Sequence, residues 1–139
     1  HRRLEAARKV AENMGFTLCE GLYLPEDWHR AIVSLENEPE GGSRCPVCFR
    51  MRLEKAYRFM LETGCEAFAS TLTMGSNKSA ILIGQIGREC GGDKFLDRDF
   101  KKKEGFKRAS ELARKWEIYR QNYCGCIYSL RERDQRKGR

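Results

Sequence analysis

The sequence has 139 residues but only three Pro and two His, and it contains no long apolar run. A membrane-spanning helix needs about 20 consecutive apolar residues, so the composition predicts a chain without one. The first residues show no apolar core of a secretory signal. A content of 40% hydrophobic and 34% charged residues excludes a disordered polar chain. A single folded domain over residues 1–130, followed by a basic tail over 131–139, is the organisation we expect.

Several common catalytic motifs are also missing. Neither His1 nor His29 has the spacing to carboxylates that is typical of zinc hydrolases. The sequence contains no serine nucleophile elbow and no glycine-rich phosphate-binding loop. Cysteine is therefore the residue type with the clearest chemical potential.

Basic residues outnumber acidic ones by 27 to 20, which gives a formal net charge of +7. The excess is concentrated in residues 97–108 and 131–139. Lys and Arg that neutralise phosphates release counterions, so this balance suits a polyanion such as a nucleic acid. A solvated helix face and a frayed terminus explain the same charges equally well.

The seven cysteines are an odd number, and nothing in the sequence suggests an oxidising compartment. Metal or redox chemistry is therefore favoured over a disulfide scaffold. Four of the cysteines form two pairs whose members are close in sequence, Cys45-Pro-Val-Cys48 and Cys124-Gly-Cys126. Cys19, Cys65 and Cys90 stand alone beside apolar residues, and we expect each to be a small buried hydrophobic side chain.

Apolar periodicity and the positions of Gly and Pro predict helices that alternate with short strands. We expect helices over residues 1–14, 25–35, 46–63, 77–89 and 105–116, and strands over 16–19, 67–72 and 94–96. This alternation predicts an α/β fold with a parallel sheet and flanking helices. Three strands make a thin sheet and the chain starts with His1, so we expect a fragment whose first strand is missing.

The Cys45–Cys48 pair opens the predicted helix over 46–63. Residues three apart share a helix face, and the positive end of the helix dipole favours thiolates. Arg44, Arg50 and Arg52 add positive charge nearby. The pair fits half of a zinc site, half of an iron–sulfur site or a thioredoxin-like redox couple, and two buried structural thiols are the other interpretation.

The Cys124–Cys126 pair follows the last predicted helix. A disulfide between residues two apart is far from relaxed geometry and should be reduced easily. Gly125 can adopt the unusual backbone angles that such a bridge requires. The pair could instead complete a four-cysteine zinc site with Cys45 and Cys48, and spacing alone slightly favours zinc.

Residues 70–78 are expected to run from the end of a strand into a helix. Ligands of parallel α/β sheets gather at that edge, and a helix start can hold an anion. Ser76 or Asn77 could instead be an ordinary helix cap. The carboxylates of residues 97–100 could face the same cleft or form surface ion pairs.

Four segments carry a resemblance to a known family: residues 44–55 (RCPVCFRMRLEK), 70–73 (STLT), 95–106 (FLDRDFKKKEGF) and 119–126 (YRQNYCGC). In this order they resemble the cobalamin-independent epoxyqueuosine reductase family of bacteria, over nearly the whole chain. The resemblance implies a Rossmann-like α/β fold similar to adenine nucleotide hydrolases. It also implies a tRNA-modifying oxidoreductase that removes the epoxide oxygen of epoxyqueuosine, giving queuosine and water, the last step of queuosine biosynthesis.

The resemblance also suggests roles for the cysteines. Cys45 and Cys48 would be ligands of a 4Fe–4S cluster, and Cys124 and Cys126 would form a redox-active pair. The remaining cluster ligands are expected upstream of His1, in a cysteine-rich motif that this sequence does not contain. An additional iron is left open, as is whether the chain folds, binds a cluster and is active alone.

The leading hypothesis is therefore a cytoplasmic enzyme that acts on tRNA carrying epoxyqueuosine, with an unknown electron donor and no membrane partner. Opening the epoxide requires polarisation of its oxygen by a metal or a proton donor, and the cluster or the thiol pair supplies electrons. Residues 101–108 and the tail are expected to hold the tRNA backbone. The candidate substrate-binding residues are Ser70, Thr71, Asp99, Arg120 and Tyr123.

Two other hypotheses remain. The first is a zinc-bound nucleic-acid-binding module without catalytic activity, in which Cys45, Cys48, Cys124 and Cys126 hold one metal ion. The second is a thiol–disulfide oxidoreductase, which would not need so basic a surface. All three hypotheses require some of these sulfur atoms to converge in the fold.

Overall fold

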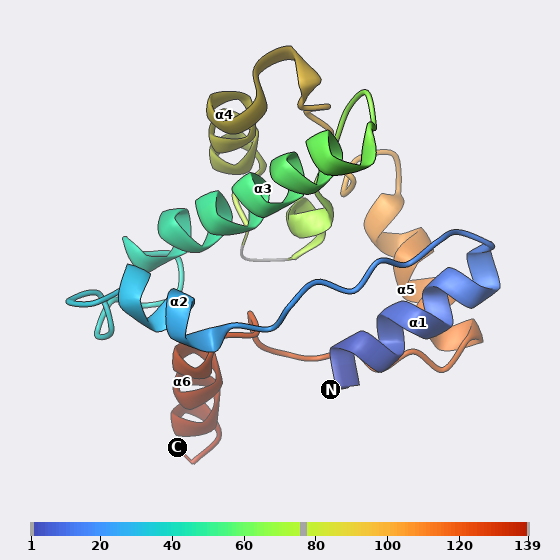
Figure 1. Cartoon of the computed structure of the whole chain (residues 1–139). Helices are drawn as coiled ribbons and strands as arrows, with labels where there is room; N and C mark the ends of the chain where they lie inside the picture. Colours follow the sequence, from blue (N-terminus) through green and yellow to red (C-terminus); the bar gives the residue numbers. More distant parts are fainter. Residues whose placement is uncertain (1, 76–77, 139) are drawn as a thin grey trace.

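The computed structural model describes residues 2–75 and 78–138, which are mainly helical (Figure 1). No helix among these residues is both long and apolar enough to cross a membrane. In chain order the elements are α1 (Arg2–Met14), α2 (Pro25–Ala31), α3 (Arg44–Thr63), η1 (Thr71–Met74), α4 (Ala80–Gly91), η2 (Gly92–Lys94), α5 (Gly105–Lys115) and α6 (Ile127–Lys137), where η marks a 3₁₀-helix.

The predicted α/β fold, a Rossmann-like parallel sheet with flanking helices, is wrong. The only β pairing among the described residues is an isolated parallel bridge between Phe68 and Phe95. The Phe68 N–H donates to the Lys94 carbonyl at 2.9 Å, and the Leu96 N–H donates to the Phe68 carbonyl at 2.8 Å. Two of the predicted strands thus meet in the expected parallel sense, but over a single residue pair.

Local hydrogen bonds explain why this bridge does not extend. After Phe68, the Ser70 hydroxyl accepts the N–H of Leu72 at 3.2 Å, and the chain winds into η1. Before Phe95, residues 92–94 form η2. Such side-chain-to-backbone bonds offer the backbone an alternative to a sheet ladder. Residues 16–19 pair with no strand in the described part of the chain, and Phe16 is 50% exposed.

The predicted helices are present, with shifted ends. Gly15 follows α1 at φ 68° and Gly64 follows α3 at φ 69°, the left-handed conformation that commonly ends helices. The helix expected over 25–35 ends at Ala31. The helix expected from residue 77 begins at Ala80, where the Ser79 hydroxyl accepts the N–H of Leu82 at 3.2 Å. Ser76 and Asn77, considered above as caps, lie outside the described residues.

An additional helix, α6, was not among the predicted elements. It begins after Cys126 and includes residues 131–137, which the sequence suggested as part of a basic tail. Figure 1 shows α6 below α2, with the chain end at its far tip. The His29 and Tyr128 rings, 6.5 Å apart, join these two helices.

The hydrophobic core lies where α3 packs against α4 and the Phe68–Phe95 bridge. Its buried members are Phe49, Leu53, Met60, Phe68, Ile83, Ile86 and Phe95. The expectation for the lone cysteines is wrong for Cys19 and Cys65, which are exposed, whereas Cys90 is partly buried against the core. An apolar neighbour in sequence does not bury a side chain when its segment is an unpaired loop.

Candidate functional site

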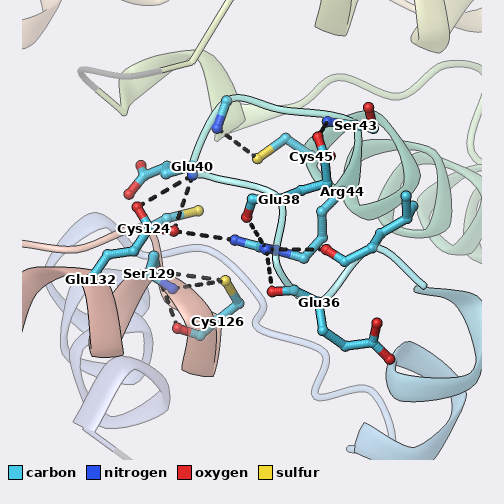
Figure 2. Close-up of polar contacts among 12 residues, drawn as sticks. Glu36, Glu38, Glu40, Ser43, Arg44, Cys45, Cys124, Cys126, Ser129 and Glu132 are labelled. Atoms are coloured by element: carbon cyan, nitrogen blue, oxygen red, sulfur yellow. Dashed lines mark hydrogen bonds and ion pairs between the residues drawn. The ribbon is translucent and has the colours of Figure 1, made fainter. Parts of the chain in front are cut away.

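Arg44, the first residue of α3, is the most deeply buried charged side chain among the described residues, with 1% exposure. Its guanidinium hydrogen-bonds to carbonyl groups of the preceding loop and to a carboxylate of α6 (Figure 2). The partners are the carbonyls of Leu35 (3.3 Å), Glu36 (3.1 Å) and Glu38, and Glu132 Oε1 (3.5 Å). This network ties the loop before α3, and α3 itself, to α6.

Two further contacts strengthen this junction. The Glu132 carboxylate accepts the backbone N–H of Glu40 at 3.1 and 3.3 Å. The guanidinium carbon of Arg44 lies 4.5 Å from the centre of the Tyr128 ring. Because Arg44 directly precedes Cys45 and α6 directly follows Cys126, the junction brings the two cysteine pairs into one region of the molecule.

Cys45 and Cys48 lie in the first turn of α3 and are both partly buried. The Cys45 sulfur accepts the N–H of Gly41 at 3.2 Å. Cys48 and Cys126 line a common recess of about 270 Å³, whose walls include Tyr23 and Trp28. One cysteine from each pair therefore lines the same space.

Cys126 caps α6. Its sulfur accepts the N–H of Ser129 at 3.4 Å, and Ser129 is 1% exposed. A hydrogen bond from Cys124 lowers the pKa of Cys126 to about 4, and bonds from Ser129 and the charge of Arg44 act in the same direction against desolvation. These contacts favour the thiolate form of Cys126, as does its position at a helix N-terminus.

Cys124 has the opposite electrostatic setting. Its hydrogen bond to Cys126 and its burial raise the pKa of Cys124, and the carboxylate of Glu40 adds to this. The Lys78 ammonium opposes these effects; its Nζ donates to the Cys124 sulfur at 2.5 Å. The contact between the two thiols therefore raises the pKa of Cys124 and lowers that of Cys126, and Lys78 favours the charged form of Cys124.

Cys124 lines a second and larger recess of about 630 Å³, which Lys78 also lines. Arg120 and Tyr123, two of the five predicted substrate-binding residues, lie in the same wall. The Arg133 guanidinium carbon is 4.9 Å from the centre of the Tyr123 ring. The basic residues of α6 that line this recess are Arg133, Arg136 and Lys137.

The other three predicted substrate-binding residues do not line this recess. Ser70 caps η1, and Thr71 is exposed. An Asp99 carboxylate oxygen accepts the N–H of Lys101 at 3.1 Å, within its own turn. The sequence placed them together on the premise of a sheet edge, and no sheet forms in the described part of the chain.

Lys78, Ser129 and Glu132 belong to no motif that points to a specific role. In the sequence, Lys78 is only the last residue of a polar loop, and Arg44 is only one positive charge next to a cysteine. Their importance comes from burial and from contacts between distant segments, which no local pattern encodes. The one sequence signal for Ser129 is its position three residues after Cys126, the spacing of a helix cap.

The described residues offer only about half of the ligands that a zinc or iron–sulfur site normally needs. Cys45 and Cys48 present two thiols from one helix turn, which fits part of an iron–sulfur or zinc ligand set. Across residues 2–75 and 78–138, no group of three or more His, Cys, Asp or Glu side chains is placed to hold one metal ion. The four-cysteine zinc site of the alternative hypothesis is therefore not formed by these residues.

Comparison with known proteins gives a consistent match. The family described as epoxyqueuosine reductase QueH matches residues 1–132. The chain is 41% identical over 115 residues to "Epoxyqueuosine reductase QueH" of Streptococcus pyogenes serotype M1, covering 81% of this chain and 45% of that protein. The protein of the same description from Staphylococcus epidermidis is 42% identical over 98 residues, covering 68% and 41%. The one from Thermotoga maritima is 33% identical over 141 residues, covering 97% and 73%. The chain thus spans less than half the length of the first two relatives.

Proposed function

The chain belongs to the epoxyqueuosine reductase QueH family, and from this premise we propose that the full-length protein reduces epoxyqueuosine in tRNA to queuosine, in the cytoplasm. The observation that carries the proposal is the position of Cys124 beside Lys78 in the wall of the larger recess. This thiol faces a large cation-lined recess, contacts Lys78 and is hydrogen-bonded to Cys126. A thiol pair beside a lysine ammonium and a substrate-sized recess is suited to reductive chemistry.

The stoichiometry of the reaction suits a thiol pair. Removal of an epoxide oxygen as water consumes two electrons and two protons and leaves a carbon–carbon double bond. Oxidation of a thiol and a thiolate to a disulfide releases two electrons and one proton, and water supplies the second proton that the reaction consumes. We propose that Cys124 and Cys126 take part as this redox couple, and that an external electron donor returns them to the dithiol.

We further propose that Cys45 and Cys48 hold a 4Fe–4S cluster together with ligands from outside the described residues. When bound, the cluster would supply electrons for the reaction. The pair is suited to this role because both thiols lie at the positive end of α3 and Cys48 shares a recess with Cys126. An additional iron is not part of this proposal.

The larger recess would receive the modified nucleotide. Tyr123 offers an aromatic face for stacking, and Arg120 offers a fork of N–H donors for phosphate or sugar oxygens. The basic residues of α6 continue this wall, whereas residues 101–108 contribute only Phe106 to it. We therefore propose that α6, more than the 101–108 segment, positions the tRNA backbone.

The proposal is tested with the anaerobically purified full-length protein and tRNA that carries epoxyqueuosine. Cys124→Ser and Cys126→Ser should each lower turnover at least about 100-fold, the scale of a lost catalytic group, while tRNA binding persists. Cys65→Ser, an exposed thiol outside both recesses, is the matched control and should retain turnover. Normal turnover by Cys124→Ser would refute the redox role of the pair.

Metal analysis tests the cluster separately. The full-length protein should be brown and contain iron and acid-labile sulfide, and Cys45→Ser or Cys48→Ser should lower both contents. Colourless protein with one tightly bound zinc would support the nucleic-acid-binding module instead. Metal-free protein with a titratable dithiol would support a thiol–disulfide oxidoreductase.

A further inference from the structure

Lys78 lies just before α4, and its side chain is held between two groups of different kinds. Its Nζ donates to the Cys124 sulfur at 2.5 Å. The same Nζ is 5.1 Å from the centre of the ring of Phe49, a core residue that is 3% exposed. An ordinary surface lysine extends into water, whereas this ammonium is fixed between an aromatic face and a sulfur.

The backbone of Lys78 is also fixed. The Lys101 ammonium donates to the Lys78 carbonyl at 2.9 Å and to the Gly75 carbonyl at 3.4 Å. The Lys78 N–H donates to the Gly75 carbonyl at 3.1 Å. A Cβ at position 75 would lie 2.7 Å from Cγ of Lys78, so glycine leaves the space through which the lysine side chain passes. Main chain and side chain are thus both positioned for the contact with Cys124.

We propose that Lys78 is a catalytic residue of the thiol pair, whose ammonium stabilises the negative charge of Cys124 when that thiol passes its proton to Cys126. This inference rests on the proposed function. In this step the S–H bond of Cys124 breaks and an S–H bond forms on Cys126, the thiol two residues away whose pKa is lowered. The charge moves from Cys126 to Cys124, and neither sulfur changes its oxidation state.

The step matters because Cys124, and not Cys126, lines the larger recess. Hydrogen bonds from Ser129 and the charge of Arg44 contribute to the lowered pKa of Cys126, whereas burial contributes to the raised pKa of Cys124. The thiolate is the nucleophile, so a protonated Cys124 would be unreactive there. Lys78 is the cation that favours the charged form of Cys124, while burial and the charge of Glu40 oppose it. The other charged groups in the walls of this recess are Arg120, Glu132, Arg133, Arg136 and Lys137.

The test measures thiol reactivity directly. The reduced full-length protein is treated anaerobically with iodoacetamide at pH 7, and alkylation of Cys124 and Cys126 is followed separately by peptide mass spectrometry. Lys78→Met should slow alkylation of Cys124 about tenfold or more, because the thiolate loses a charge-assisted hydrogen bond. Lys78→Arg should keep most of the rate, and the Cys126 rate should not fall in either variant. Lys94→Met, which removes an exposed lysine outside both recesses, is the matched control.

A second variant keeps Lys78 and disturbs only its position. Gly75→Ala should slow Cys124 alkylation in the same direction but less, since the added Cβ displaces the lysine side chain. An unchanged Cys124 rate in Lys78→Met, in protein whose circular dichroism and thermal midpoint match the wild type, would overturn the inference. A loss of helical signal in Lys78→Met together with a wild-type Cys124 rate in Gly75→Ala would also overturn it, in favour of a structural tether.

Steady-state kinetics separate this inference from the proposed function. Lys78→Met should lower kcat about tenfold or more with little change in KM for tRNA. A raised KM at wild-type kcat would assign Lys78 to substrate binding and overturn the inference. If Cys124→Ser loses turnover while Lys78→Met keeps wild-type kcat, only the inference fails. If Cys124→Ser keeps turnover, the proposed function of the pair fails, and a catalytic Lys78 fails with it.

Discussion

At the scale of single residues, the buried charge of Arg44 organises the region between the two cysteine pairs. A guanidinium is suited to this place because its planar fork can donate to several carbonyls and to a carboxylate at once. The carbonyls belong to residues 35–38 and the carboxylate to Glu132. Desolvation of this charge is offset only while these partners stay in place.

Replacing Arg44 with Met should destabilise the full-length protein by about 3 kcal/mol, because three carbonyls and the Glu132 carboxylate lose a donor. Urea unfolding followed by circular dichroism measures this change. Arg58→Met removes an exposed arginine from the same helix and should stay within about 0.5 kcal/mol of the wild type. Equal stabilities of the two variants would contradict the structural role of Arg44.

Cys126 gives a prediction about pH. Its pKa is lowered from 9.0 to about 4, so the folded protein favours the thiolate. The contribution of Cys126 to the stability of the folded state is therefore complete above pH 9. It is lost as the pH falls toward 4 and the thiolate is protonated in the folded protein too. Its alkylation by iodoacetamide should therefore stay fast down to about pH 5, whereas the urea-unfolded protein should lose about tenfold per pH unit below the ordinary thiol pKa.

Ser129→Ala removes the hydroxyl beside Cys126 but leaves the backbone N–H. The midpoint of the Cys126 alkylation profile should therefore move upward without reaching that of the unfolded chain. Peptide mass spectrometry at a series of pH values measures both profiles. A wild-type midpoint near that of the unfolded protein would show that the fold does not stabilise this thiolate.

At the scale of elements, the packing of Phe95 against α4 explains why that helix requires a glycine at position 87. On α4, Gly87 is buried, and a Cβ there would lie 2.3–2.5 Å from ring atoms of Phe95. The close approach lets the Phe95 ring pack against α4, next to the Phe68–Phe95 bridge. Helix propensity alone would prefer alanine at this position.

Gly87→Ala should therefore destabilise the protein by about 1–3 kcal/mol, because overpacking outweighs the gain in helix propensity. Denaturant unfolding of the full-length protein gives the measurement. Ile81→Ala on the same helix is the control, since Ile81 is 84% exposed and its truncation should change stability by about 0.5 kcal/mol at most. A stabilised Gly87→Ala would mean that the Phe95 ring can move away at no cost.

Helices and strands differed in how well local sequence predicted them. The helix over 46–63 was predicted because Leu53 and Met60 repeat at helical spacing and Gly64 follows, and both side chains are buried in α3. The strand over 67–72 failed because a strand is stable only with partners, and Phe68 finds one residue to pair with. Ser70 then supplies a local cap that turns the chain into η1.

At the scale of the whole molecule, the structure shows where some of the basic residues behind the net charge of +7 lie. Arg136 and Lys137 of α6 are exposed and line the larger recess, on the same wall as Tyr123. Residues that contact phosphates contribute to affinity and to its salt dependence but not to base recognition. The proposed tRNA function therefore predicts an electrostatic effect that is separate from catalysis.

The double variant Arg136→Gln/Lys137→Gln should weaken tRNA binding and reduce the slope of log Kd against log salt concentration by up to about two. Turnover at saturating tRNA should be retained, because neither residue touches the thiol pair. Arg58→Gln is the control for a lost surface charge on α3. An unchanged slope in the double variant would remove α6 from the tRNA-binding surface.

The sequence by itself predicted five of the six α-helices among the described residues, and it indicated the family. Each of these depends on near neighbours or on the order of motifs, which can be read along one chain. Only the tertiary structure decided that Lys78 meets Cys124, that Arg44 joins the loop before α3 to α6, and that the predicted strands form no sheet among the described residues. These outcomes depend on burial and on contacts between segments far apart in sequence. Desolvation sets the energetic effect of a buried charge, and a strand is stable only when a partner strand pairs with it.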